Sequence, residues 1–270
     1  MSDNAHVSEP VAQRNAENEE AWRAVLMGEA RGLQFTRSVV RHIPAGPRCK
    51  LCLAPLRPPG SVLLRLVGFG PSGLNRRLCR ACFRALDRHP GGAEVELSLM
   101  FADVRGSTTL AERIPAQEFS RLISRFYGVA ANVVDRWDGL VDKFVGDEVV
   151  ALFMTGVGGP NHAERAVAAA RDLIRETRGR EGEPWVAVGA GVHTGVAFVG
   201  RVGEGDACDF TAVGDPMNAT ARLASTATAG EILVSAPAAR ASGLDTSNLQ
   251  SRSLALRGRD EVLDAWVATA

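Results

Sequence analysis

The sequence has no long hydrophobic run, no excess of charge of either sign and few cysteines. No apolar stretch approaches the roughly 20 residues that a helix needs to cross a bilayer. The first 20 residues are polar and acidic, unlike a signal peptide or a transit peptide. The 31 basic and 31 acidic side chains balance, so bulk electrostatics gives no reason to expect a nucleic-acid or membrane partner. We therefore expect a cytoplasmic chain without a membrane anchor.

The remaining composition is that of a globular protein. Of the 270 residues, 46% are hydrophobic and 23% are charged, enough for one sizeable core and a small second unit. We expect a disordered tail over residues 1–18, a helix and a cysteine module over 19–90, and a larger domain over 91–270. Within the middle segment, the spacing of apolar residues predicts one helix from about Glu19 to Val40.

Four of the five cysteines form two C-x-x-C pairs, Cys49 with Cys52 and Cys79 with Cys82. In a cytosolic chain such pairs bind metal more often than they form structural disulfides. Two pairs separated by 26 residues fit tetrahedral Zn²⁺ in a closed structural site, with an iron–sulfur cluster or a redox dithiol as alternatives. The segment is too short to build its own core, so a metal would staple it. A regulatory partner would act through this region, residues 1–93.

From Glu94 onward the hydrophobic pattern alternates between strands and helices. The expected strands lie at 94–104, in a hairpin over 140–153, in two strands over 185–203 that turn near Thr194-Gly195, at Phe210, at 231–235 and in a closing hairpin. The expected helices lie at about 115–138, 162–177 and 215–225. This β-α-β-β-α-β order predicts an α+β, ferredoxin-like split-βαβ sandwich, with helices on one face of a mainly antiparallel sheet.

Asp103 ends the first of these apolar strands, where an unpaired buried carboxylate would be costly. Asp147 lies at the turn of the hairpin, so two strand-end carboxylates can reach one site. Paired carboxylates suit Mg²⁺ or Mn²⁺, which take further ligands from substrate phosphates. An aspartate at a strand end is more often a turn or cap residue, and spacing alone leaves that alternative open.

The loop after Asp103 offers successive backbone N–H groups at a strand-to-helix turn, a pattern that can cradle phosphate. These groups belong to Val104, Arg105, Gly106, Ser107 and Thr108. Divalent metals beside a phosphate cradle together indicate a nucleoside triphosphate substrate.

Three separated motifs, FADVRGST, VDKFVGDEVVALF and FTAVGDPMNATARL, occur in this order. Together they resemble the catalytic domain of class III nucleotidyl cyclases over about residues 94–268. The resemblance implies that Asp103, Asp147 and the backbone of Val104 bind two Mg²⁺ or Mn²⁺ ions per site.

The same resemblance assigns roles to five further residues. It implies that Lys143 and Thr211 contact the base, that Asn218 orients the ribose and that Arg222 stabilises the transition state. Arg257 aligns loosely with a phosphate-contacting lysine of the family. Taken singly, Lys143 and Arg222 read as solvated surface residues, and the matches in all three motifs together favour the functional interpretation.

The two base-contacting positions favour adenine. A lysine ammonium only donates hydrogen bonds and a threonine hydroxyl can accept one, which complements N1 and the N6 amino group of adenine. ATP is therefore the expected substrate. Many relatives have aspartate where this chain has Thr211, and a neutral acceptor discriminates less sharply against GTP.

The family resemblance also implies a head-to-tail homodimer, because its metal aspartates and its base-contacting and transition-state residues come from different subunits. The expected activity is adenylate cyclase, which makes cyclic AMP and pyrophosphate from ATP. The alternatives are a guanylate cyclase that uses GTP and a non-catalytic cyclase-like module that binds nucleotide or a partner.

Overall fold

The computed structural model describes residues 9–40, 43, 48–49, 51–66, 68–72, 78–88, 91–178, 185–203, 209–255 and 262–270. The chain divides into two compact units. The first unit comprises residues 1–95 and 198–211, and the second comprises 96–197 and 212–270. Among the described helices, none has the length and apolar character needed to span a bilayer.

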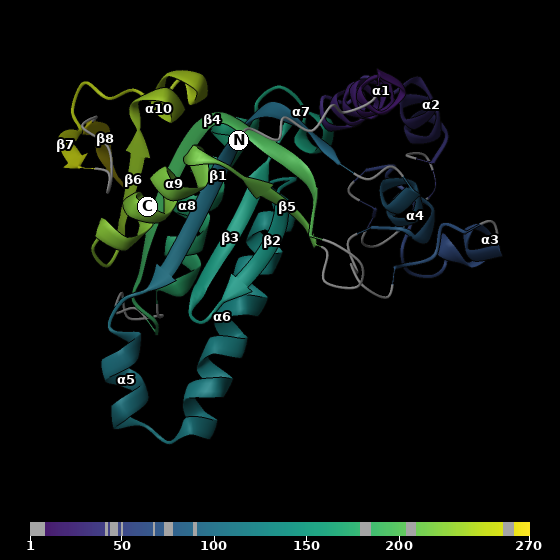
Figure 1. Cartoon of the computed structure of the whole chain (residues 1–270). Coiled ribbons are helices and arrows are strands. Elements are labelled where there is room, and N and C mark those ends of the chain that lie inside the picture. Colours follow the sequence, from purple (N-terminus) through teal and green to yellow (C-terminus); the bar gives the residue numbers. More distant parts are fainter. Residues whose placement is uncertain are drawn as a thin grey trace, which may run out of the picture. The chain divides into compact units, whose positions relative to one another are not determined.

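An eight-stranded sheet organises the second unit, with strand order β2-β3-β1-β4-β6-β8-β7 and β5 pairing with β4 (Figure 1). The strands are β1 Gly92–Val104, β2 Leu140–Val145, β3 Glu148–Phe153, β4 Val188–Val202, β5 Asp209–Val213, β6 Glu231–Ser235, β7 Gln250–Ala255 and β8 Val262–Thr269. The β4–β6 pair is parallel, whereas β1–β3, β2–β3, β6–β8 and β7–β8 are antiparallel. The order β2-β3-β1-β4 is that of a split βαβ unit and confirms the predicted α+β fold.

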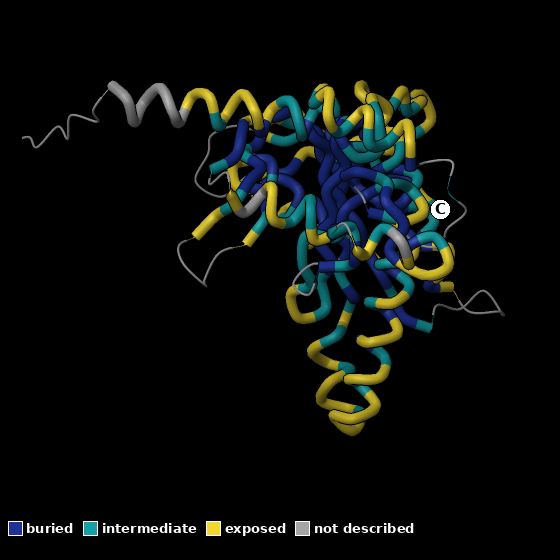
Figure 2. The backbone as a smooth tube through the Cα atoms, turned by 90° about the vertical axis from the view of Figure 1, so that its right-hand side faces the viewer, coloured by how far each residue is buried: buried dark blue, intermediate teal, exposed yellow. Residues whose placement is uncertain are grey.

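Helices cover both faces of this sheet. On one face lie α6 Ala116–Arg136, α8 His162–Thr177 and α10 Ala236–Ser242. Their apolar sides form the main core with alternate strand residues such as Met100, Ala102 and Val104. Buried residues are the dark blue stretches of the backbone in Figure 2.

The opposite face carries α9 Asp215–Thr226, contrary to the expectation of helices on one face only. Leu223 and Ala227 pack there against Leu233 and Ala265 in a second, smaller core. Ile232 and Val234, the neighbours of Leu233 in β6, belong to the main core, so the alternation of the strand separates the two faces.

The first unit contains α1 Glu9–Leu26, α2 Arg31–Val40, α3 Ser61–Leu66 and α4 Arg80–Arg88. Helix α1 begins inside the tail that was expected to be disordered, because its Ala, Gln, Glu and Arg residues are strong helix formers as well as polar ones. Residues 1–8 of that expected tail lie outside the described residues. The single helix predicted up to Val40 is in fact two, and Gly28 with φ 78° ends the first.

The turn predicted at Thr194-Gly195 is wrong, since β4 runs without a break through both residues. Gly195 serves close packing instead. A Cβ atom there would meet Pro216 Cγ at 3.0 Å and His193 Nε2 at 3.2 Å, so glycine allows the start of α9 to approach the strand.

Most other predicted elements are confirmed to within a few residues, including the β2–β3 hairpin, α6, α8, α9, β6 and the β7–β8 hairpin. Short helices were not predicted from the sequence, among them α5 Ser107–Arg113, α7 Thr155–Gly158 and α10. Their length of seven residues or fewer gives too little periodicity to recognise.

A buried histidine makes one contribution to stability that is lost below pH 6.5. His193 lies in β4 with Nδ1 2.9 Å from Ser235 Oγ, and burial lowers its pKa to about 4. At His193 the unfolded chain therefore binds more protons than the folded one between pH 6.5 and pH 4, so the contribution of this residue to the free energy of unfolding decreases with acidification in that window. The contribution of His193 is at most about 3 kcal/mol.

Denaturant unfolding of the wild-type chain and of His193→Gln, compared from pH 7 to pH 4, measures this contribution. Relative to the wild-type chain, the glutamine variant should become more stable as the pH falls across the window. An equal change of stability in both proteins would contradict the assignment to His193.

Candidate active site and cysteine cluster

Three carboxylates meet where β1 ends and the β2–β3 hairpin turns. The antiparallel register pairs Asp103 with Glu148, and Gly146 with φ 60° forms the tight turn that places Asp147 beside them. The backbone N–H of Val104 donates to the Asp147 carbonyl at 3.3 Å. We call Asp103, Asp147 and Glu148 the carboxylate cluster.

Two carboxyls of the cluster, Asp103 and Glu148, have raised pKa values. Burial raises the pKa of Asp103 to about 6, assisted by hydrogen bonding with Asp147, although the Arg105 guanidinium opposes the shift. Burial also raises the pKa of Glu148 to about 7, and the charges of Asp103 and Asp147 add to this. Negative charge is thus concentrated beyond what Arg105 offsets, the condition under which a divalent cation binds well.

Glu148 was not predicted as a site residue. It directly follows Asp147 in the sequence, but only the register with Asp103 shows that it shares their environment.

Arg105 fastens the end of β1 to helix α9. Its Nη2 forms an ion pair with Asp103 Oδ2, and its Nη1 donates to the carbonyls of Ser225 at 3.1 Å and Ala227 at 3.3 Å. Its backbone N–H donates to the Ala187 carbonyl at 2.8 Å. Arg105 therefore links two elements that are far apart in the sequence.

These hydrogen bonds reduce the number of backbone N–H groups that could bind phosphate. The N–H groups of Val104 and Arg105 are both used within the fold, so they are not available as the sequence suggested. The N–H groups of Ser107 and Thr108 lie in the first turn of α5, where a helix supplies no acceptor of its own. Gly106, with φ 71°, precedes that turn.

Lys143 owes its position to a β-bulge. The pairing of β2 with β3 runs from Val141–Ala151 directly to Lys143–Val150, so Asp142 is the extra residue. The bulge lets Val141 and Phe144, three residues apart, both pack on the main core. The two residues between them take the other face, where Lys143 Nζ lies 3.3 Å from Asp142 Oδ2.

The sheet register places Lys143 on the same face as Asp103. Lys143 pairs with Val150, and Val150 pairs with Phe101, two residues before Asp103 in β1. Side chains two residues apart in a strand share a face. Met100 and Ala102 point into the main core on the other face, so Asp103 and Lys143 lie on the side that carries α9.

Helix α9 presents Asn218 and Arg222 to solvent. Four residues apart, they lie on one side of the helix, while Ala219 and Leu223 are buried beneath it. Within the described part of the chain, neither side chain makes a hydrogen bond or ion pair. Both are therefore accessible for interaction with another molecule.

Two predicted site residues remain, Thr211 and Arg257. Thr211 lies in β5, is 6% exposed and belongs to the first unit. Arg257 lies outside the described residues.

The four cysteines of the two C-x-x-C pairs converge on one point. Their Sγ atoms all lie within 4.8 Å of one another, and Cys52 Sγ and Cys79 Sγ are 3.6 Å apart. A disulfide would need about 2.0 Å, whereas the edge of a tetrahedron of thiolates around Zn²⁺ is about 3.8 Å. The cluster therefore has the size of a metal site, and a metal ion fits it.

Backbone and side-chain groups around the cluster suit thiolate ligands. The N–H of Cys79 donates to Cys49 Sγ at 3.3 Å, and the N–H of Cys82 donates to Cys79 Sγ at 3.4 Å. Hydrogen bonds among the thiols lower the pKa of Cys49 and raise the pKa of Cys52 and of Cys82. Arg37, whose own pKa is lowered by burial, faces the thiols and donates from Nε to the Leu51 carbonyl at 2.6 Å.

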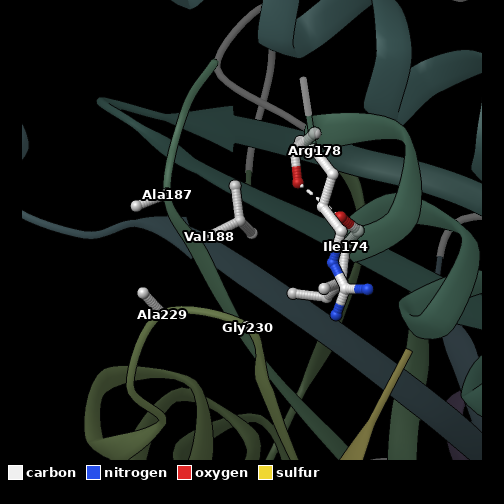
Figure 3. A pocket seen from close by; sticks show the side chains of 7 residues that line it. Ile174, Arg178, Ala187, Val188, Ala229 and Gly230 are labelled. Carbon is white, nitrogen blue, oxygen red and sulfur yellow. Dashed lines mark hydrogen bonds between the residues drawn. The ribbon is translucent and has the colours of Figure 1, made fainter. Parts of the chain in front are cut away.

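A cavity of about 280 Å³ in the second unit does not coincide with the carboxylate cluster (Figure 3). Seven residues line it: Ile174, Thr177, Arg178, Ala187, Val188, Ala229 and Gly230. None of these described residues is a carboxylate or a predicted site residue, so this cavity is not the candidate active site.

Comparison with known families identifies the domain that contains this site. The model of the adenylate and guanylate cyclase catalytic domain matches residues 93–268. The chain belongs to this family. The match covers the carboxylate cluster, Lys143, Thr211, Asn218 and Arg222, and leaves out the four cysteines.

Solved structures of this family agree with the fold. The guanylyl cyclase Cya2 is 27% identical, with a TM-score of 0.59 over 66% of this chain and 93% of that chain. The adenylyl cyclase CyaB from P. aeruginosa is 26% identical, with a TM-score of 0.55 over 66% of this chain and 95% of that chain. The two similarities are nearly equal, so they do not distinguish ATP from GTP as the substrate.

Curated relatives include uncharacterized mycobacterial proteins. One from Mycobacterium tuberculosis is 35% identical over 167 residues, which is 60% of this chain and 29% of that protein. Another from the same species is 34% identical over 179 residues, 63% of this chain and 32% of that protein. The matched region therefore spans about a third or less of these relatives.

Proposed function

We propose that this chain is an adenylate cyclase that converts ATP to 3′,5′-cyclic AMP and pyrophosphate as a homodimer. The observation that carries the proposal is the contact of Asp103 with Asp147 at the ends of paired strands, on the sheet face that also holds Lys143 and α9. These residues supply a metal site, a base contact and a transition-state cation on the same side of the sheet.

The carboxylate cluster suits hard divalent cations. Two aspartate carboxyls in hydrogen-bond contact, one with a raised pKa, form an oxygen donor set that Mg²⁺ or Mn²⁺ favours. Asp103, Asp147 and the backbone of Val104 would hold the ions, two per site. Bound there, the ions would lower the pKa of the ribose 3′-OH and neutralise charge on the phosphates.

The side chains of the chain itself position the reacting groups. Asn218 orients the ribose so that its 3′-OH lies in line with the α-phosphorus and the leaving pyrophosphate. Arg222 stabilises the charge that grows on the α-phosphoryl oxygens, which makes its contribution larger in the transition state than in the ground state. The N–H groups of Ser107 and Thr108, together with Arg257, contact the phosphates.

Base selection follows from hydrogen-bond complementarity. The Lys143 ammonium donates to N1 of adenine and the Thr211 hydroxyl accepts from the N6 amino group. Guanine has a donor at N1 and an acceptor at O6, so both contacts would be mismatched. The position of Lys143 on the Asp103 face supports its role as a base contact.

We infer the homodimer from the different surroundings of the proposed catalytic residues and of the metal ligands within one chain. Asn218 and Arg222 are exposed and make no polar contacts among the described residues, whereas Asp103 is tied to Arg105 in its own chain. A second copy related by a two-fold axis would supply Asn218 and Arg222, together with the base contacts Lys143 and Thr211, to each metal site.

An assay of purified protein with ATP or GTP and Mn²⁺, with the product identified by mass, tests the activity. Cyclic AMP and pyrophosphate should form in equal amounts, with a higher kcat/KM for ATP than for GTP. Asp103→Asn should reduce the rate at least a hundredfold, roughly the loss expected for a catalytic metal ligand.

Asp245→Asn is the matched control, because this exposed carboxylate only caps the turn at Ser247 and should leave the rate unchanged. A preference for GTP would replace the adenylate assignment by a guanylate one. A wild-type rate no higher than that of Asp103→Asn would refute catalysis.

We further propose that the four cysteines hold a structural Zn²⁺ ion. Metal analysis should find about one zinc per chain, because four buried or half-buried thiols within 4.8 Å of one another form a closed tetrahedral site. Cys79→Ser should lose most of the zinc and unfold at a lower temperature, because the metal staples a segment with little core of its own.

Cys208→Ser, which changes the one cysteine outside the two C-x-x-C pairs, should keep the zinc. Iron with acid-labile sulfide, or a chain purified without metal, would contradict the zinc assignment.

A further inference from the structure

The first part of the base-contacting strand β5, residues 209–211, belongs to the same compact unit as the N-terminal helices. Residues 198–211, which we call the arm, group with residues 1–95 and not with the rest of the catalytic domain. The arm ends at Thr211, the position proposed to contact the base. We call the described part of residues 9–88 the N-terminal module. Its contacts with the arm are therefore also contacts with the strand that carries Thr211.

The start of the arm is held by backbone contacts with Gly91 and Gly92, which follow the N-terminal module. The N–H of Arg201 donates to the Gly91 carbonyl at 2.8 Å. A Cβ atom on Gly200 would lie 2.4 Å from Gly92 Cα, so these two glycines allow the chains to touch. This contact fixes where the arm begins.

The end of the arm is held by an aromatic stack. Trp22 in α1 is 3% exposed, and its ring stacks on that of Phe210 with a centroid separation of 5.9 Å and an interplanar angle of 14°. Phe210 immediately precedes Thr211 in β5, so the two side chains point to opposite sides of the strand. The pairing of β5 with β4 and the stack on one side of the strand therefore both restrain the strand that carries Thr211.

Trp22 is in turn connected to the four-cysteine cluster. The N–H of Ala30 donates to the Ala24 carbonyl at 3.0 Å and joins α1 to the turn before α2. Helix α2 contributes Arg37, which donates to Leu51 between Cys49 and Cys52, and Arg48 donates to the Val40 carbonyl at 2.9 Å. The cysteine cluster thus supports the helix pair that carries Trp22.

We propose that Trp22 and Phe210 are positioning residues for base recognition: the N-terminal module holds β5 through their stack and thereby orients Thr211 towards the nucleotide base. This inference rests on the proposed function, in which Thr211 accepts from the adenine amino group. It gives the N-terminal module a role in nucleotide affinity and choice, separate from the metal-dependent chemistry at Asp103.

Steady-state kinetics of the full-length Trp22→Ala variant test this role. The KM for ATP should rise about three- to tenfold, the equivalent of one aromatic pair. The ratio of kcat/KM for ATP over that for GTP should fall, while kcat stays within about twofold because the metal ligands and Arg222 are untouched. Trp22→Phe should restore both values, since it keeps an aromatic ring in the stack.

Phe35→Ala is the matched control, because Phe35 is an aromatic residue of the same module but is 72% exposed on α2. It should leave KM and the nucleotide ratio unchanged. An unchanged KM and ratio in Trp22→Ala, or an equal change in Phe35→Ala, would overturn the proposal. A loss of kcat alone in Trp22→Ala would overturn it as well.

Hydrogen exchange separates this inference from the proposed function, because it needs no activity. In Trp22→Ala the amides of residues 209–213 should exchange faster, while those of β3 and α8 stay as in the wild-type chain. If the wild-type chain makes no cyclic nucleotide but this local effect is present, the proposed function fails and the positioning of β5 stands. Unchanged exchange in β5 would contradict the positioning itself.

Discussion

The pairing of β1 with β3 forces Asp103, Asp147 and Glu148 together, and the rest of the site depends on how their charge is balanced. Two like charges about 4 Å apart repel by about 4 kcal/mol at an effective dielectric constant of 20. Arg105 lowers the pKa of Asp103, yet burial and the neighbouring carboxyl outweigh it and the pKa stays raised at about 6. The Arg105 guanidinium alone therefore does not balance the negative charge of the carboxylate cluster, which explains why this position suits a divalent metal.

The same sheet geometry underlies the proposal that the site is completed by a second copy of the chain. The bulge at Asp142 turns Lys143 to the face of Asp103, and α9 lies on that face with Asn218 and Arg222 directed to solvent. The Arg222 guanidinium has no ion-pair partner among the described residues, so it contributes little to folding there, but it can stabilise charge on a bound phosphate. The proposed base contact also depends on the first unit, because Thr211 lies at the end of the arm, which groups with the N-terminal helices.

Local periodicity was enough to predict the long elements, and the pairing of Asp103 with Asp147 was inferred from their positions at a strand end and at a hairpin turn. It could not predict that Lys143 shares their face, since a single extra residue at Asp142 reverses the alternation. Glu148 and Arg105 were misjudged for a similar reason, because their partners are set by strand register and by the end of α9. The Thr-Gly pair in β4 resembled a turn, although Gly195 is needed for contact with Pro216. The Trp22–Phe210 stack joins residues far apart in sequence and leaves no local signal.

The central claim, that each catalytic site is assembled from two copies of the chain, is tested most directly by co-expressing two inactive variants. Asp103→Asn removes the metal site and Arg222→Ala removes the transition-state cation, so each homodimer should be inactive. In an equal mixture half of the dimers combine the two variants, and each of these has one intact site. The account predicts recovery of about a quarter of the wild-type rate. No recovery in dimers shown to contain both variants would contradict it.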